Sequence, residues 1–279
     1  MIASKHNFPW RYLLLAYGLT WIFWIPVALT RQDYQASPIL LAVMFLGVFG
    51  PGMAGILMTY REQGREGRRD FWHRVVDFRR INIKWYVLIL LLFPILHFIS
   101  IAVNHWLGGD PPEFAFVKEA LAMPAGILIV VILYLLQSAL EELGWRGYML
   151  DHLQVIWKPV TASLVLGIFH AFWHFPLFYI VGTNQSRYLS GIDFTVFVGF
   201  VLAGSIYSTW CYNENHRSTL AVILLHTVAN LSLDTFLLPG TGEYIFKIVT
   251  AFGAVMIIIA WSLPTWKRKQ VQSIRWRSP

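Results

Sequence analysis

Three apolar stretches of the chain carry polar groups of the kind that hydrolytic enzymes use. The first ends in two adjacent carboxylates, Glu141 and Glu142, followed by Arg146. Residues four apart share a face of a helix, so Glu142 and Arg146 can pair, whereas Glu141 points about 100° away, beside Gln137 and Ser138. We therefore expect Glu142 and Arg146 to be structural and Glu141 to be free to act.

The other two stretches supply imidazole and amide groups. His170 and His174 lie one helical turn apart. Further along, His226 and Asn230 have the same spacing, and Asp234 continues their stripe near the end of its stretch, where we expect it to be solvated. An ionisable group inside hydrocarbon costs about 2.5 to 3.5 kcal/mol, so each of these groups needs a partner or a task.

If the three stretches pack together, their side chains form a set suited to amide hydrolysis. A carboxylate with a histidine can take a proton from water. A second histidine with an asparagine amide can donate hydrogen bonds to the oxyanion that forms when the water attacks a carbonyl. The alternative is that these groups only hydrogen-bond between helices, as a lone intramembrane histidine more often does. The complete set favours catalysis.

Three motifs can be read in order on the three stretches, namely Glu141-Glu142-x-x-x-Arg146, Trp173-His174-Phe175-Pro176 and His226-x-x-x-Asn230. Together they resemble the CPBP family of intramembrane endopeptidases, the CAAX proteases and bacteriocin-processing enzymes also called Abi, with its CAAX prenyl protease 2-like members. Each motif alone is weak, but the ordered set is specific and covers residues 141–230. The resemblance implies a fold of several membrane helices.

The resemblance also implies roles for the matched residues. Glu141 would be the general base on the attacking water, with His174 assisting. His226 and Asn230 would form the oxyanion site, while Glu142 and Arg146 would hold the helix geometry by their pairing.

One position departs from the family pattern. The second motif is commonly F-x-x-x-H, but His170 stands four residues before His174, and Phe169 is one residue out of register. We expect His170 to be a tolerated packing substitution. The alternative is that it joins His174 as an additional polar group in the site.

The need for a metal ion is open at this point, because the family includes members described as metalloproteases and members described as metal-independent glutamate peptidases. Glu141, His174 and His226, with His170 as a fourth donor, offer the nitrogen and oxygen atoms that zinc accepts. The H-E-x-x-H pattern of common zinc peptidases is absent from the sequence. We expect glutamate-activated water without a required cofactor, with zinc as the alternative.

The elements that must position these residues are membrane-spanning helices. Of the 279 residues 57% are hydrophobic and 13% are charged, whereas a soluble domain has about 25% charged residues. A soluble globule is therefore excluded. We predict an all-α, multi-pass membrane protein with about eight transmembrane helices, at roughly 10–29, 38–60, 84–106, 124–145, 159–181, 194–212, 218–238 and 244–263.

The predicted spans leave no separate soluble core, so we expect one membrane domain over residues 1–279, with the peptidase core at about 124–238. In the second span, Gly47, Gly50, Gly52 and Gly55 are expected to serve close helix packing.

Basic residues gather on one side of the predicted spans and account for the net charge of +7. If the amino terminus is cytoplasmic, 18 of the 22 Lys and Arg residues lie inside, including Lys5, eight in the loop 61–84 and five in the carboxyl-terminal tail. This bias predicts that both termini are cytoplasmic. The loop is expected to set the topology, and binding to anionic lipid headgroups is the alternative.

The sequence thus predicts an intramembrane endopeptidase in a bacterial or archaeal cell membrane. The expected partners are membrane lipid and hydrophobic or lipidated peptides, with CAAX-type prenylated peptides implied by the resemblance, and no nucleic acid. Two other function classes stay open. One is a catalytically silent membrane scaffold or bacteriocin-immunity protein. The less favoured one is a proton-coupled transporter, for which related halves or paired broken helices would be expected.

Overall fold

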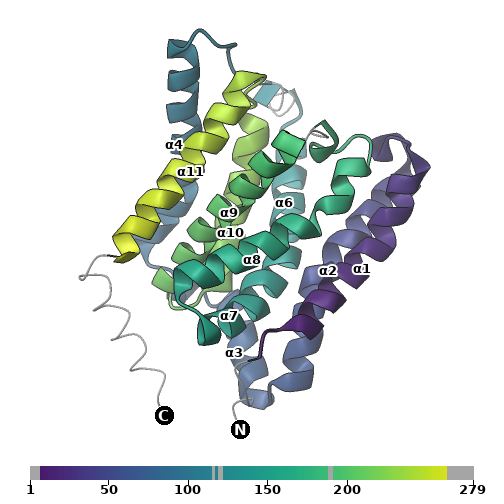
Figure 1. Ribbon diagram of the computed structural model, residues 1–279, viewed down its shortest axis with the longest axis vertical. Coiled ribbons are helices and arrows are strands. Elements are labelled where there is room, and N and C mark those ends of the chain that lie inside the picture. Colours follow the sequence, from purple (N-terminus) through teal and green to yellow (C-terminus); the bar gives the residue numbers. More distant parts are fainter. Residues whose placement is uncertain (1–6, 115–116, 119–121, 188–190, 263–279) are drawn as a thin grey trace.

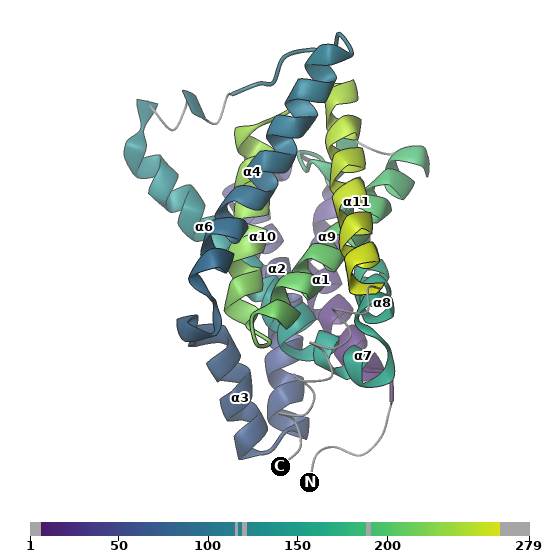
Figure 2. The ribbon, with the colours of Figure 1, turned by 90° about the vertical axis from the view of Figure 1, so that its left-hand side faces the viewer.

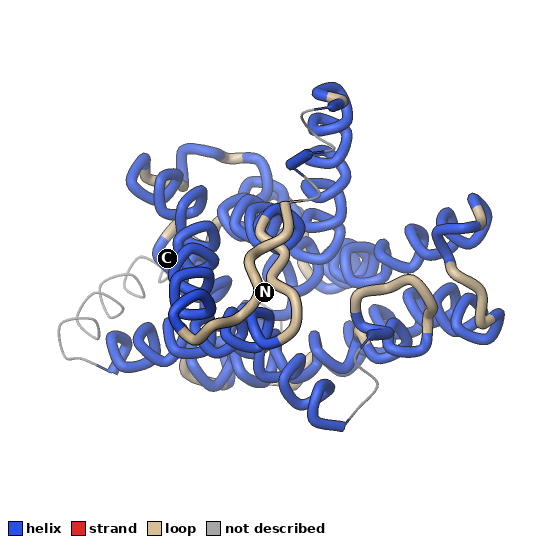
Figure 3. Tube along the Cα trace, turned by 90° about the horizontal axis from the view of Figure 1, so that it is seen from above, coloured by secondary structure: helices blue, strands red, loops and turns tan. Residues whose placement is uncertain are grey.

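The computed structural model describes residues 7–114, 117–118, 122–187 and 191–262, which form a bundle of helices joined by loops (Figures 1 and 3). Within these residues the bridge between Glu113 and Leu237 is isolated, and no strand is formed. The predicted all-α class is confirmed.

Each predicted span corresponds to a helix of the bundle. The helices are α1 (Trp10–Thr30), α2 (Pro38–Glu62), α4 (Ile83–Trp106), α6 (Pro124–Gly144), α8 (Pro159–Trp173), α9 (Gly191–Glu214), α10 (Thr219–Thr235) and α11 (Thr241–Ser262). Two shorter helices, α3 (Arg65–Val76) and α7 (Leu150–Ile156), accompany them. A π-helix, Trp145–Met149, joins α6 to α7 without a break.

Seven stretches of the described residues are helical, long and apolar enough to cross a membrane. The remaining predicted span is α10, which has 17 residues. At a rise of 1.5 Å per residue it is about 26 Å long, slightly less than the hydrocarbon core of a bilayer. The expectation of about eight spans is therefore close to what the structure contains.

Local sequence explains where several helices begin. The side chains of Ser37, Asn82 and Ser218 each accept a hydrogen bond from a backbone N–H in the first turn of the following helix. Pro38 and Pro159 occupy the first position of their helices, where a missing N–H costs nothing.

The helices that carry the polar motifs lie between two helical pairs. In Figure 1, α1 and α2 form one side of the bundle, α4 and α11 the other, and α6, α8 and α10 lie between them. One apolar core includes Trp24, Trp145 and Trp173, and a second includes Phe93 and Phe246. Helix α8 contributes Leu166 to the first core, and α10 contributes Val222 to the first and Leu225 to the second.

Large apolar side chains cover the outside of the bundle. On α4, Leu90 and Phe98 are each 58% exposed, and on α11, Ile248 and Phe252 are each 67% exposed. Such a surface is stable against lipid and not against water. The protein is an integral, multi-pass membrane protein.

The glycines of α2 provide close helix packing, as predicted. A Cβ atom at Gly47 or Gly50 would contact side chains of α1, Trp24 and Thr20, at about 2 Å. A Cβ at Gly52 would lie 2.4 Å from the carbonyl oxygen of Leu140 on α6. One helix thus holds α1 on one face and α6, the helix of the two glutamates, on another.

The prediction that residues 61–84 form a loop is wrong in one respect, because most of this segment is helical. It contains α3, which buries Phe71 and Arg74 and lies at the lower end of the bundle in Figure 2. Lys5 and the basic tail, which also entered the topology prediction, lie outside the described residues. The cytoplasmic location of the termini stays a prediction.

Candidate active site

Two buried glutamates lie in the last turn of α6, where the helix meets the π-helix. Glu141 is 2% exposed and Glu142 is 1% exposed. The predicted pairing is present, since Arg146 Nη1 lies 2.8 Å from Oε1 and 3.0 Å from Oε2 of Glu142. Insertions of this π type are frequent at functional sites, and here the insertion contains Arg146 itself.

Glu142 has a second partner that the sequence motifs did not indicate. Nδ1 of His226, on α10, lies 2.9 Å from Oε1 of Glu142. Since a carboxylate can only accept, Nδ1 carries the proton if the carboxylate is ionised. Glu142 therefore connects α6 to α10 and fixes the ring of His226.

Glu141 contacts α8 instead. Nε2 of His170 lies 3.0 Å from Oε2 of Glu141, and the amide of Gln137 donates a weak hydrogen bond of 3.4 Å to Oε1. His170 is buried, and its ring packs on that of Trp145, with 4.9 Å between centroids. The ring of His170 thus packs against Trp145, as expected, and also contacts Glu141, as the alternative would have it. Its role in the site stays a prediction.

His174 lies one turn beyond His170, where α8 ends. Its Nδ1 donates a hydrogen bond of 2.9 Å to the carbonyl oxygen of His170, because a carbonyl can only accept. Nδ1 therefore holds the proton of the neutral ring, and Nε2 keeps a free lone pair. Helix α1 holds this end of α8, since Trp21 Nε1 donates to the Trp173 carbonyl at 3.0 Å and Tyr17 donates to that of Phe169.

Three of these residues form a group that could hold a metal ion. One donor atom each from Glu141, His170 and His174 lies within 4.8 Å of the others. The metal set expected from the sequence also included His226, with His170 as the fourth donor. In the structure, one ring nitrogen of His226 is directed to Glu142.

The remaining members of the α10 stripe differ in their surroundings. Asn230 is half-buried one turn from His226, and α10 packs against α6. Asp234 accepts a hydrogen bond from Tyr134 of α6, so the expectation that Asp234 is merely solvated is wrong.

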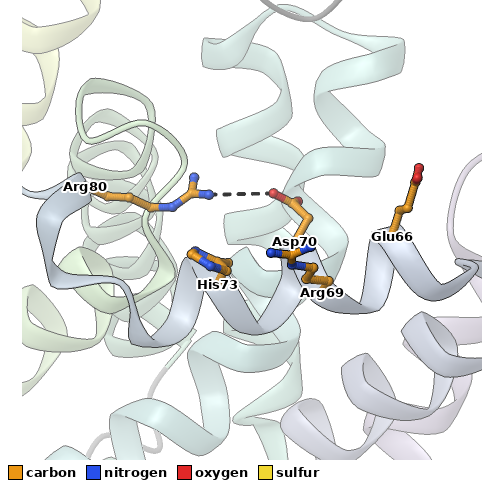
Figure 4. A pocket seen from close by; sticks show the side chains of 5 residues that line it. All are labelled: Glu66, Arg69, Asp70, His73 and Arg80. Carbon is orange, nitrogen blue, oxygen red and sulfur yellow. Dashed lines mark ion pairs between the residues drawn. The ribbon is translucent and has the colours of Figure 1, made fainter. Parts of the chain in front are cut away.

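A pocket of about 280 Å³ lies elsewhere, between α3 and Arg80. Figure 4 shows its lining residues, Glu66, Arg69, Asp70, His73 and Arg80. None of them belongs to the glutamate and histidine cluster, and Arg80 lies 3.8 Å from Asp70, so the charges partly neutralise one another.

Comparison with known proteins adds two findings. Residues 122–232 match a family described as "Type II CAAX prenyl endopeptidase Rce1-like". The chain is also 28% identical, over 264 residues, to a CAAX prenyl protease 2 of Methanococcus maripaludis, and the alignment covers 93% of this chain and 96% of that relative. The family match contains α6, α8 and most of α10, and its residues include Glu141, Glu142, Arg146, His170, His174, His226 and Asn230.

Proposed function

The chain is related to the Rce1-like CAAX prenyl endopeptidases and is an intramembrane endopeptidase, and from this premise we propose how its residues perform the hydrolysis. Glu141 is the general base. The observation that carries this assignment is that an oxygen of the buried Glu141 lies within 4.8 Å of a ring nitrogen of His170 and of a ring nitrogen of His174.

The hydrogen bonds around the two glutamates differ in a way that supports this choice. Arg146 contacts both carboxylate oxygens of Glu142, and His226 contacts one of them. Among the described residues, Glu141 has His170 on one oxygen and only the long hydrogen bond from Gln137 on the other. Glu141 can therefore accept a proton from a water, while Glu142 is held by its partners.

The proposed reaction begins when Glu141 takes a proton from a water molecule as its oxygen attacks the peptide carbonyl carbon. His174 orients that water through Nε2, the nitrogen left free by the bond to the His170 carbonyl. Collapse of the tetrahedral intermediate breaks the C–N bond. Glu141 then returns the proton to the leaving amine, so that the carboxylate is regenerated.

His226 and Asn230 stabilise the oxyanion of that intermediate. With Nδ1 of His226 donating to Glu142, a proton on Nε2 makes the ring an imidazolium that can donate to the oxyanion. The carboxylate of Glu142 favours that charged form, and Arg146 keeps the carboxylate ionised by pairing with it. The amide of Asn230, one turn along α10, is the second donor.

The cluster also has the donor chemistry of a zinc site. Two imidazole nitrogens and a carboxylate oxygen are found together in catalytic zinc sites. The bond from His174 Nδ1 to a backbone carbonyl is the arrangement that orients metal-bound histidines. Glu141, His170 and His174 would be the ligands, and zinc would supply Lewis-acid polarisation. We favour the route in which Glu141 acts without zinc.

The substrate class that we propose is a membrane-associated peptide, with prenylated carboxyl-terminal CAAX-type peptides as the first candidates. This follows from the names of the matched family and of the Methanococcus maripaludis relative. It fits a site on helices with lipid-facing apolar surfaces, because a lipidated peptide would reach the protein from the bilayer.

The purified protein in detergent tests this proposal with a panel of peptides of one sequence, prenylated, acylated or unmodified. We expect the prenylated peptide to be cleaved with the highest kcat/KM, and the rate to persist after treatment with a chelator. Faster cleavage of the unmodified peptide would contradict the substrate class. Activity lost on chelation and restored by zinc would contradict the metal-independent route.

A further inference from the structure

Arg74 of α3 is buried to an extent that is unusual for a residue in a basic membrane-flanking segment. It is 1% exposed, whereas Arg65, Arg68 and Arg69 on the same helix are exposed. A long charged side chain is seldom fully buried unless it is paired. Its partners therefore indicate why this arginine differs from its neighbours.

The guanidinium of Arg74 contacts four groups from different elements. Nη2 donates to the carbonyl oxygen of Gly147 at 2.9 Å, and Nη1 donates to the hydroxyl of Tyr212 at 2.6 Å. Nη1 also lies 3.1 Å from Asp151 Oδ2, and Nε lies 3.0 Å from Asp70 Oδ2. One side chain thus joins α3 to the π-helix, α7 and α9.

Burial disfavours the charge of Arg74, but Tyr212 and Asp151 outweigh it and raise the pKa above its usual value. Asp151 also pairs with Arg217, and its charge raises the pKa of Arg217. Both arginines therefore stay charged, and titration of their guanidinium groups plays no part in the network.

Arg74 contacts Gly147, a residue that lies close in sequence to the glutamates of the candidate active site. Gly147 lies in the π-helix directly after Arg146, the partner of Glu142. A Cβ atom at Gly147 would lie 3.0 Å from the ring of Phe71, so α3 also covers this residue directly. A second link holds the same π-helix, because the hydroxyl of Tyr148 donates to Glu62 Oε2 at 2.6 Å.

We propose that Arg74 is a positioning residue for hydrolysis: it holds the π-helix through the Gly147 carbonyl and so fixes the turn of α6 that presents Glu141 and Glu142. The inference rests on the proposed function for its effect on rate. The segment 61–84 then has a task beyond setting topology, because it clamps the reactive end of α6 from outside the membrane-spanning helices.

Substitution by lysine separates this role from simple charge. Lysine keeps the positive charge, but its compact ammonium group cannot match the planar fork of arginine and reach the same set of acceptors. The matched control is Arg69→Lys, the same change at an exposed position of the same helix.

The experiment measures kcat and KM on a cleavable peptide, together with deuterium exchange of the backbone amides of residues 141–150. For Arg74→Lys we expect kcat to fall about 10- to 100-fold, the cost of small misplacements of catalytic groups, with KM within about twofold. Exchange should be faster at 141–150, with a thermal midpoint near that of the wild type. Arg69→Lys should match the wild type in every measurement.

Several outcomes would overturn the inference. Normal kcat with faster exchange would make Arg74 merely structural, and unchanged exchange would mean that it does not hold the π-helix. If Arg74→Lys fails to fold, Tyr212→Phe removes the hydroxyl that joins Arg74 to Asp151 and should give the same changes in smaller degree. If the wild type cleaves no peptide, the proposed function fails. Deuterium exchange at residues 141–150 still tests whether Arg74 holds the π-helix.

Discussion

The two adjacent glutamates differ in the partners that hold them. Glu142 is balanced by Arg146 and by His226, so removing either partner would leave a buried carboxylate with less compensation. Within the described part of the chain no arginine pairs with Glu141, which instead lies near His170 of α8 and His174 at its end. Neighbours in sequence therefore have different environments, because a helix turns them about 100° apart.

The variant His170→Phe restores the residue that the family pattern more commonly has at this position. It removes the hydrogen bond to Glu141 Oε2 while keeping an aromatic ring against Trp145. We expect kcat to fall about 10- to 100-fold, the usual cost of losing a partner that orients a reactive group. The measurement is the rate of peptide cleavage at saturating substrate.

His97→Phe is the matched control, since His97 is buried on α4, bonds only to its own helix at Phe93 among the contacts described, and stacks on Phe246. That control should leave kcat unchanged. A normal rate in His170→Phe would return His170 to the packing role.

Residue types and spacing predicted the site residues, but not all of their contacts. The Glu142 and Arg146 pair follows from i,i+4 spacing within one helix. The contacts of His170 with Glu141 and of His226 with Glu142 depend on how α8 and α10 are rotated against α6. A single sequence does not determine that rotation, so the contact of His170 with Glu141 was not predicted.

At the scale of elements, α2 determines where the reactive turn of α6 lies. Gly52 faces the Leu140 carbonyl, and Gly55 faces Leu143 and Gly144. In the reverse direction, a Cβ at Gly144 would lie 2.1 Å from the Pro51 carbonyl. The backbones of the two helices thus touch on both sides of the glutamates.

Gly52→Ala tests this contact. The added methyl group would have to displace the backbone at Leu140, so we expect a loss of stability of about 1 to 3 kcal/mol, as for overpacked cores, together with reduced kcat. Thermal unfolding in detergent and a cleavage assay measure the two effects.

The control for that change is Gly18→Ala on α1, where an added Cβ would have nothing within 4 Å. It should leave both stability and rate close to the wild type. Equal effects of the two substitutions would contradict a specific role of the contact between α2 and α6.

The helix α3 shows where prediction from the pattern failed. The eight basic residues of the segment 61–84 read as a polar loop, and only Phe71 with Arg74 three residues later indicates a face that could be buried. The burial of Arg74 depends on acceptors from the π-helix, α7 and α9. Those acceptors are distant in sequence, and their convergence is a tertiary property.

At the scale of the whole molecule, the composition and the apolar periodicity were sufficient to predict a polytopic helical bundle with close to the right number of spans. Hydrocarbon permits little besides helices in a protein of this kind, which makes the prediction strong. The site lies on the central helices α6, α8 and α10, between the α1–α2 pair and the α4–α11 pair (Figure 1). Such a placement keeps the charged groups away from lipid.

The measurement that tests the central claim most directly is the kcat of Glu141→Gln on a prenylated peptide, beside the wild type, at equal amounts of folded protein. Glutamine keeps the shape of the side chain but cannot accept the proton of water. Our account predicts a fall of at least about 10²- to 10⁴-fold, the contribution of a general base, with an unchanged thermal midpoint. A rate within a few fold of the wild type would contradict the assignment of Glu141 as the base.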